Sequence, residues 1–117
     1  MEYIFKTTKL TTIVVEAKCL KKILQLVEKN KHSNLKNLIV LDENEEMDIQ
    51  NKLKEKGLNL YTMNDVISKG ENEGKDIQLK EPKGDSIALI CFTSGTTGIP
   101  KGTILTQNNI MSEVSII

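Results

Sequence analysis

The sequence predicts an α/β fold in which a largely parallel sheet is flanked by helices. Two observations lead to this fold class. Short apolar, β-branched segments alternate with longer segments of helical periodicity, and Ile, Leu and Val must build the core. Aromatic residues make up only 3% of the 117 residues, and tryptophan is absent. A chain of this length forms at most one ordinary domain, with right-handed crossovers between its parallel strands.

The first part of the chain predicts a strand, a helix and a second strand. Residues 11–17 are few and β-branched, which favours a strand. Residues 18–31 carry lysines on one side and apolar residues on the other, as in an amphipathic helix. The apolar face comprises Leu20, Ile23, Leu24 and Val27. Residues 37–42 form a continuous apolar run that ends in an aspartate, which is typical of a strand buried on both faces.

The middle of the chain predicts a helix, a short strand and another helix. Residues 43–57 begin with acidic side chains and end with basic ones before a glycine, an order that complements the helix dipole. Residues 58–61 follow as a third short strand. Thr62 is placed to cap a helix over 63–70, which again ends at a glycine.

The last third of the chain predicts a connection, two strands and a final helix. Residues 71–84 combine charge, glycine and proline without a period, which indicates a surface connection. Residues 86–94 are the most apolar run in the chain, and 102–106 form a further short strand. Thr106 is placed to cap a helix over 107–117.

Charge and hydropathy exclude several classes of function. Sixteen basic residues, all of them lysine, balance sixteen acidic ones, and no segment carries a long run of one sign. The basic surface that nucleic-acid binding requires is therefore missing, and we expect no nucleic-acid partner. No window approaches the roughly 18 to 20 consecutive apolar residues of a membrane span, and the N-terminus lacks the pattern of a secretory signal. We expect neither a transmembrane segment nor a signal peptide.

Other reactive side chains are expected to be structural. Cys19 and Cys91 lie far apart in apolar stretches, which favours buried free thiols in a reducing compartment over a disulfide or a metal site. His32 is the sole histidine, and its Lys/Asn-rich surroundings place it on the surface. The acidic cluster from Asp42 to Glu46 is expected to begin a solvated helix and to bind no metal.

The segment between the last two predicted strands concentrates groups that bind phosphate. The candidate contacts are Thr93, Ser94, Gly95, Thr96, Thr97, Gly98 and Lys101. Glycines let backbone N–H groups approach a ligand, hydroxyls donate hydrogen bonds, and the lysine adds a compact positive charge. In an open α/β sheet, ligands bind beyond the carboxyl ends of the strands, where this segment is expected. A generic flexible hairpin turn is the simpler alternative, but donors and one cation without a carboxylate predict a phosphate site.

Two common phosphate motifs do not fit this segment. The dinucleotide fingerprint G-x-G-x-x-G is absent, and in the P-loop of NTPases the lysine follows the last glycine, whereas Lys101 precedes Gly102. From Phe92 to Gly102 the sequence instead resembles, without a break, the signature aromatic-Thr-Ser-Gly-(Ser/Thr)-Thr-Gly-x-Pro-Lys-Gly of the adenylate-forming enzymes. Within that superfamily, the cysteine before Phe92 and the upstream segments look most like long-chain fatty acyl-CoA synthetases. Gln107 departs from the pattern, since a histidine is usual there.

The resemblance implies that residues 1–117 are a partial AMP-binding domain, part of the large N-terminal domain of an adenylate-forming enzyme. The phosphate loop would lie at 93–102, and the C-terminal lid domain, the adenine site and the acyl tunnel would be absent. The implied ligands are ATP with Mg2+, a fatty acid and coenzyme A. A fatty carboxylate attacks the α-phosphate, pyrophosphate leaves, and coenzyme A then takes the acyl group. We expect no catalytic residue and no metal ligand within this segment, whose role is to stabilise the leaving pyrophosphate.

Two other functions stay open at this stage. One is a catalytically silent, truncated paralogue that binds nucleotide phosphate or docks on a full-length synthetase. The other is a different adenylate-forming enzyme, such as an aromatic-acid-CoA ligase or a peptide adenylation domain. Because the later motifs of the family are missing, the chain is expected to be a fragment or truncated relative that is inactive by itself. The resemblance implies a cytoplasmic location or a peripheral one on an intracellular membrane.

Overall fold

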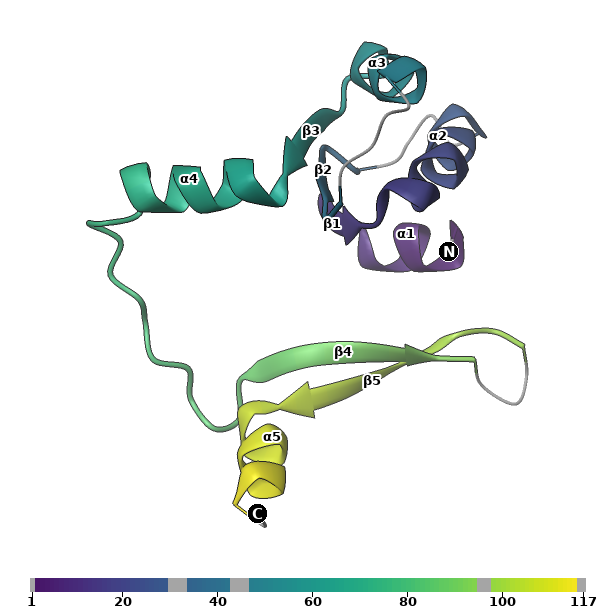
Figure 1. The fold of residues 1–117 in the computed structure, drawn as a ribbon. Helices are drawn as coiled ribbons and strands as arrows, with labels where there is room; N and C mark the ends of the chain where they lie inside the picture. Colours follow the sequence, from purple (N-terminus) through teal and green to yellow (C-terminus); the bar gives the residue numbers. More distant parts are fainter. Residues whose placement is uncertain (1, 30–33, 43–46, 95–97, 116–117) are drawn as a thin grey trace. The chain divides into compact units, whose positions relative to one another are not determined.

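A computed structural model describes residues 2–29, 34–42, 47–94 and 98–115 of the chain (Figure 1). They form two compact units, Met1–Ile77 and Gln78–Ile117. The first unit contains a three-stranded parallel sheet with helices, and the second contains a two-stranded antiparallel sheet and one helix. The predicted α/β fold with a parallel sheet and flanking helices is confirmed, while the last two strands depart from the parallel arrangement.

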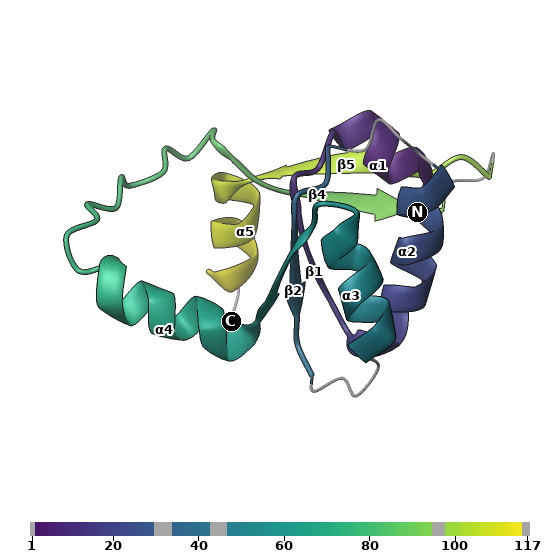
Figure 2. The same ribbon diagram turned by 90° about the horizontal axis from the view of Figure 1, so that it is seen from above.

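The first unit is a parallel sheet with helices on both sides. Its elements are α1 (Glu2–Thr8), β1 (Thr12–Val15), a 3-10 turn (Ala17–Cys19), α2 (Leu20–Lys29), β2 (Asn37–Val40), α3 (Met47–Glu55), β3 (Asn59–Thr62) and α4 (Met63–Glu73). The strand order is β1-β2-β3. Helices α2 and α3 lie together on one side of this sheet, and α4 lies on the other side (Figure 2). Helix α1 is an element that the sequence did not predict.

The core of the first unit lies between the sheet and helices α2 and α3. Its fully buried side chains are Leu20, Ile23, Leu38 and Leu53. The apolar face predicted for the helix over 18–31, which is α2, is therefore confirmed. Leu24 is also buried, and Val27 packs against the core. All the buried apolar residues among those described lie in the first unit, so the second unit has no comparable core of its own.

Helix α3 ends at Glu55, and the predicted glycine, Gly57, forms the turn that terminates it. Gly57 has a φ of 83°, a left-handed conformation that favours glycine. Its N–H donates to the carbonyl of Lys54 at 2.8 Å, and the N–H of Leu58 donates to the carbonyl of Leu53 at 3.2 Å. Leu53 and Leu58 are both buried. This pair of bonds with its apolar contact is a Schellman motif, which ends the helix and returns the chain to the sheet.

A polar ladder crosses the sheet on the face opposite to α2 and α3. Thr12, Asn37 and Asn59 are aligned in register on the three strands. The side-chain amide of Asn37 donates to the hydroxyl of Thr12 at 3.1 Å, and the amide of Asn59 donates to Oδ1 of Asn37 at 3.0 Å. The three side chains therefore form one continuous hydrogen-bonded row across β1, β2 and β3.

Helix α4 begins at the predicted cap but runs beyond the predicted end. The Asp65 N–H donates to the hydroxyl of Thr62 at 3.1 Å, and the Thr62 N–H donates to Oδ2 of Asp65 at 2.7 Å, which completes a capping box. The sequence predicted an end at Gly70, and this boundary is wrong because the helix continues to Glu73. A salt bridge of 2.9 Å between Lys69 and Glu73 spans that last turn and supports it.

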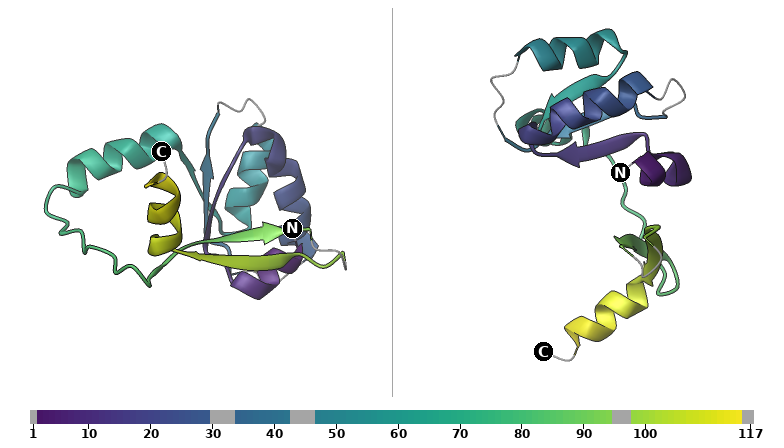
Figure 3. Two further views of the ribbon diagram at one scale, coloured as in Figure 1. Left: turned by 90° about the horizontal axis from the view of Figure 1, so that it is seen from below. Right: turned by 90° about the vertical axis from the view of Figure 1, so that its right-hand side faces the viewer.

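The second unit consists of β4 (Ile87–Thr93), β5 (Lys101–Thr106) and α5 (Gln107–Val114), and α5 continues directly from β5 (Figure 3). The two strands are antiparallel because residues 94–100 are too few for the crossover that a parallel pair needs. The predicted cap of the last helix is confirmed, since Thr106 and Asn109 form a second capping box. No helix in the described part of the chain combines the length and apolar character that crossing a membrane requires.

The two capping boxes predict different responses to acid. Hydrogen bonds from the backbone N–H and then the hydroxyl of Thr62 lower the pKa of Asp65 from its ordinary value of 3.8. Because the folded pKa is lowered, the stabilisation of α4 is fully present above the ordinary pKa of 3.8. It is lost as the pH falls through the lower pKa of the folded state. The box of α5 uses the amide of Asn109, which does not titrate in this range.

A pH titration followed by NMR of the intact chain would test this difference. The N-terminal amides of α4 should move with a midpoint below 3.8, while those of α5 should stay unchanged over the same range. In Asp65→Asn the acid transition at α4 should disappear. A midpoint for Asp65 at or above its ordinary value would contradict the prediction.

Candidate phosphate-binding hairpin

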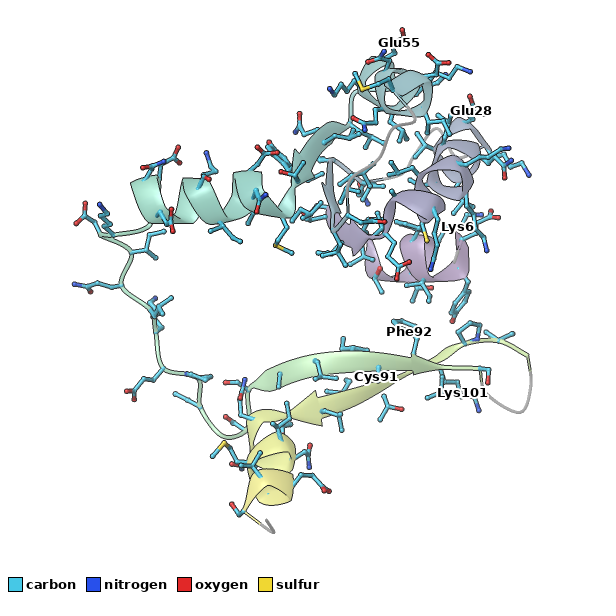
Figure 4. All side chains as sticks on the ribbon, in the orientation of Figure 1. Lys6, Glu28, Glu55, Cys91, Phe92 and Lys101 are labelled. Carbon is cyan, nitrogen blue, oxygen red and sulfur yellow. The ribbon has the colours of Figure 1, made fainter. Side chains whose placement is uncertain are left out.

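The predicted phosphate contacts lie at the tip of the β4–β5 hairpin. The last three pairs of its register are Cys91 with Thr103, Phe92 with Gly102, and Thr93 with Lys101. Because successive side chains alternate between faces, Lys101 shares one face with Thr93 and Cys91, and Phe92 lies on the other. Figure 4 shows Phe92 on one side of the hairpin and Cys91 and Lys101 on the other. The structure therefore places Lys101 and Thr93 opposite each other, with their side chains on the same face, at the mouth of the loop.

The described part of the loop is exposed and includes a backbone conformation that favours glycine. Thr93, Ser94, Gly98 and Lys101 are all exposed. Gly98 has a φ of 74°, and a β-carbon there would meet nothing within 4 Å. Glycine is therefore favoured at this position because the backbone is left-handed, and not because a side chain would lack space. The other three predicted contacts, Gly95, Thr96 and Thr97, lie outside the described residues.

The base of the hairpin is tied to the start of helix α5. The N–H of Gln107 donates to the carbonyl of Ser86 at 3.0 Å, and the N–H of Asn108 donates to the carbonyl of Gly84 at 2.9 Å. A β-carbon on Gly84 would lie 2.3 Å from Oδ1 of Asn108, so the two segments approach closely. These bonds connect the residues before β4 to those after β5, and the tip extends away from this closed end.

The charge around the hairpin suits an anion. The sequence has no acidic residue between Asp85 and Glu113, and Lys101 is the only basic residue after Lys83. One cation with neighbouring hydroxyls and no carboxylate favours phosphate oxygens over a metal ion. Among the residues that the structure describes, no group of three or more His, Cys, Asp or Glu side chains is arranged to hold a metal. A Mg2+ ion that accompanied a nucleotide would take its ligands largely from phosphate oxygens and water, a coordination that this donor set can accept.

The two cysteines depart in part from their prediction. Both are free, as expected, but Cys19 is only partly buried and Cys91 is exposed. The predicted burial of Cys91 is wrong: within the described residues its strand pairs with β5 alone, and a two-stranded sheet leaves both faces open. His32 lies outside the described residues.

A cavity of about 380 Å³ lies at the carboxyl ends of β2 and β3, and unlike the hairpin loop it is lined by carboxylates. It is lined in part by Asp42 and Asp65. Oδ1 of Asp42 accepts the N–H of Ala17 at 2.6 Å, and Asp65 is held by the cap of α4. The expectation that this acidic cluster binds no metal stays a prediction, because Glu43, Glu45 and Glu46 lie outside the described residues.

Comparisons with known proteins place this geometry in a family. The family described as AMP-binding enzyme matches residues 1–117. Long-chain-fatty-acid–CoA ligase 6 of Homo sapiens is 34% identical over 119 residues, which cover 98% of this chain and 16% of that protein. Long-chain-fatty-acid–CoA ligase 5 of Mus musculus is 35% identical over 95 residues, which cover 80% of this chain and 13% of that protein. The chain thus spans less than a fifth of the length of these relatives.

A solved structure shares the fold. The adenylation domain of a carboxylate reductase from Mycobacterium chelonae superposes with a TM-score of 0.70 at 24% identity, covering 91% of this chain and 18% of that one. The A-PCP didomain of carboxylic acid reductase from Segniliparus rugosus, solved with AMP, gives a TM-score of 0.69 at 17% identity, covering 95% and 16%. Family match, relatives and fold agree, and the chain belongs to the AMP-binding enzyme family.

Proposed function

We propose that this chain supplies the phosphate-binding hairpin of a long-chain fatty acid-CoA ligase. Its contacts with the phosphates of ATP would be Thr93, Ser94, Gly95, Thr96, Thr97, Gly98 and Lys101. The observation that carries the proposal is the pairing of Lys101 with Thr93 at the mouth of a loop whose sequence contains no carboxylate. The identity of about a third to long-chain-fatty-acid–CoA ligases supports the choice of substrate class.

The chemistry asked of these residues is electrostatic. When a fatty carboxylate attacks the α-phosphate, negative charge builds up on the departing pyrophosphate. Fixed N–H groups, hydroxyls and the Lys101 ammonium stabilise that charge without having to reorganise. Mg2+, when bound with ATP, supplies further neutralisation of the phosphate oxygens. Coenzyme A would receive the acyl group in the complete enzyme, which acts in the cytoplasm or at the surface of an intracellular membrane.

Calorimetric titration of the intact chain with magnesium pyrophosphate tests the phosphate role directly. We expect saturable binding with one pyrophosphate per chain. A chain that is folded by NMR and releases no binding heat would contradict the role of the loop.

A chimera tests the ligase assignment separately. The matching segment of the human ligase 6 is replaced by residues 1–117 of this chain, and acyl-CoA formation from a long-chain fatty acid is measured. We expect the chimera to form acyl-CoA and its Lys101→Met variant to lose most of that activity. A soluble, folded chimera that binds ATP but forms no acyl-CoA would argue against the ligase assignment.

A further inference from the structure

A packing contact lies directly behind the phosphate loop, on the face of the hairpin opposite to Lys101. Gly102 has no side chain, and side chains of β4 fill the space that one would occupy on that face. A β-carbon at Gly102 would lie 3.0 Å from Cγ2 of Ile90 and 3.3 and 3.4 Å from Cζ and Cε1 of Phe92. The edge of the Phe92 ring therefore lies close to the space that a side chain at Gly102 would occupy, across the strand pair.

Gly102 is the one glycine in β5, so its backbone has the widest intrinsic conformational range in that strand. Glycine within a strand has no side chain to pack and gains backbone freedom that other residues lack. It directly follows Lys101, so any movement of its backbone displaces the lysine relative to Thr93. An aromatic ring that packs across a strand onto a glycine restores the packing that the glycine lacks. Phe92 is placed to do so here.

Two side chains, those of Ile90 and Phe92, lie against the Gly102 position near the tip, and Phe92 is the one that pairs directly with Gly102. Hydrogen bonds from Gln107 and Asn108 hold the base, but the register between Ile87 and Leu89 is irregular. The regular ladder runs from Leu89 to Thr93 against 101–105. Within it, Phe92 is the aromatic residue nearest to the loop, and its ring is partly buried while Thr93 and Lys101 are exposed.

We infer that Phe92 is a positioning residue for the phosphate site. Its ring holds the Gly102 backbone and so keeps Lys101 opposite Thr93, although it lies on the other face and touches no phosphate. The consequence for ligand binding rests on the proposed function. The consequence for the hairpin does not, and each can be measured without the other.

The first measurement is NMR of the intact chain without ligand. In Phe92→Leu we expect the cross-strand NOEs between residues 93 and 101 to be lost, while those between Ile90 and Ile104 remain. Phe92→Tyr keeps the ring and should keep all of these NOEs. Ile104→Ala, which removes an apolar side chain from the same face farther from the loop, serves as the matched control and should retain the pair at 93 and 101.

The second measurement is pyrophosphate affinity in the presence of Mg2+. Phe92→Leu should bind about two- to fivefold more weakly, the factor that corresponds to the freedom of a glycine released from its restraint. Phe92→Tyr should bind like the unmodified chain.

The outcomes separate the two proposals. If Phe92→Leu keeps the NOEs between residues 93 and 101, the positioning role is overturned whatever the unmodified chain binds. If the NOEs are lost but pyrophosphate binds the variant as tightly as the unmodified chain, the positioning role is overturned as well. If the NOEs respond as expected and the unmodified chain binds no pyrophosphate, the role of Phe92 in the hairpin stands and the proposed function fails.

Discussion

Replacing Lys101 with methionine is expected to weaken the binding of magnesium pyrophosphate by about tenfold to a hundredfold. A hydrogen bond to a charged group contributes about 1.5–3 kcal/mol, which corresponds to a loss of this size. Methionine keeps a long unbranched side chain and removes only the ammonium. No second basic residue follows Lys83 in the sequence, so none on the hairpin can take over the charge. Isothermal titration calorimetry at a fixed ionic strength gives the two dissociation constants.

Lys80→Met is the matched control for Lys101→Met. Lys80 is exposed in the same unit, so its loss changes the net charge equally but leaves the hairpin intact. We expect the affinity of this variant to change by less than about twofold, because exposed charges at a distance are largely screened by salt. Equal losses in the two variants would mean that pyrophosphate responds to net charge and does not bind at the loop.

Replacing Leu38 with alanine is expected to reduce the free energy of unfolding of the first unit by about 2–5 kcal/mol, the range measured for large-to-small changes in cores. Leu38 lies on the central strand β2 and is 0% exposed. Its removal leaves a cavity between the sheet and the two covering helices. For a unit of this size, such a loss is a large part of the total stability. Urea unfolding followed by far-UV circular dichroism gives the difference.

Val14→Ala tests whether that loss comes from burial. Val14 lies on the neighbouring strand β1, but its side chain is 52% exposed on the opposite face of the sheet. We expect a change of about 0.5 kcal/mol or less for this variant, as for most surface substitutions. A loss in Val14→Ala as large as that in Leu38→Ala would contradict the placement of the core on the helix-covered face.

Features set by neighbouring residues were the ones that the sequence predicted best. Thr62 and Thr106 form the predicted caps, and Gly57 ends α3, because a cap depends on residues three or four positions apart. Gly70 was mistaken for a helix end because glycine often ends a helix, whereas α4 continues past it and Lys69 and Glu73 form a salt bridge across it. Helix α1 was missed because it has only seven residues and none is fully buried, although Phe5 packs against the core, so the sequence pattern is too short to reveal it.

For the candidate site, the residue types could be interpreted from the sequence, but their arrangement in space could not. Residue types alone predicted a phosphate loop, since glycine, hydroxyl and lysine groups act through chemistry that does not depend on their partners. The opposition of Lys101 and Thr93 depends on strands pairing antiparallel, which a largely parallel prediction did not contain. The packing of Phe92 against Gly102 and the exposure of Cys91 also follow from that antiparallel pairing. An aromatic residue facing a glycine across an assumed hairpin would have been the signal to look for.

The ladder of Thr12, Asn37 and Asn59 bears on how the sheet finds its alignment during folding. Strands joined through helices meet late, since closing such long loops costs entropy before any contact forms. A strand displaced by two residues still turns the same side chains toward the helices, so burial alone rejects this misfolded arrangement poorly. The displacement would set Asn37 beside Val14, and the hydrogen bond between Asn37 and Thr12 would be lost. The ladder thereby gives the native alignment a lower energy than the alignment shifted by two residues.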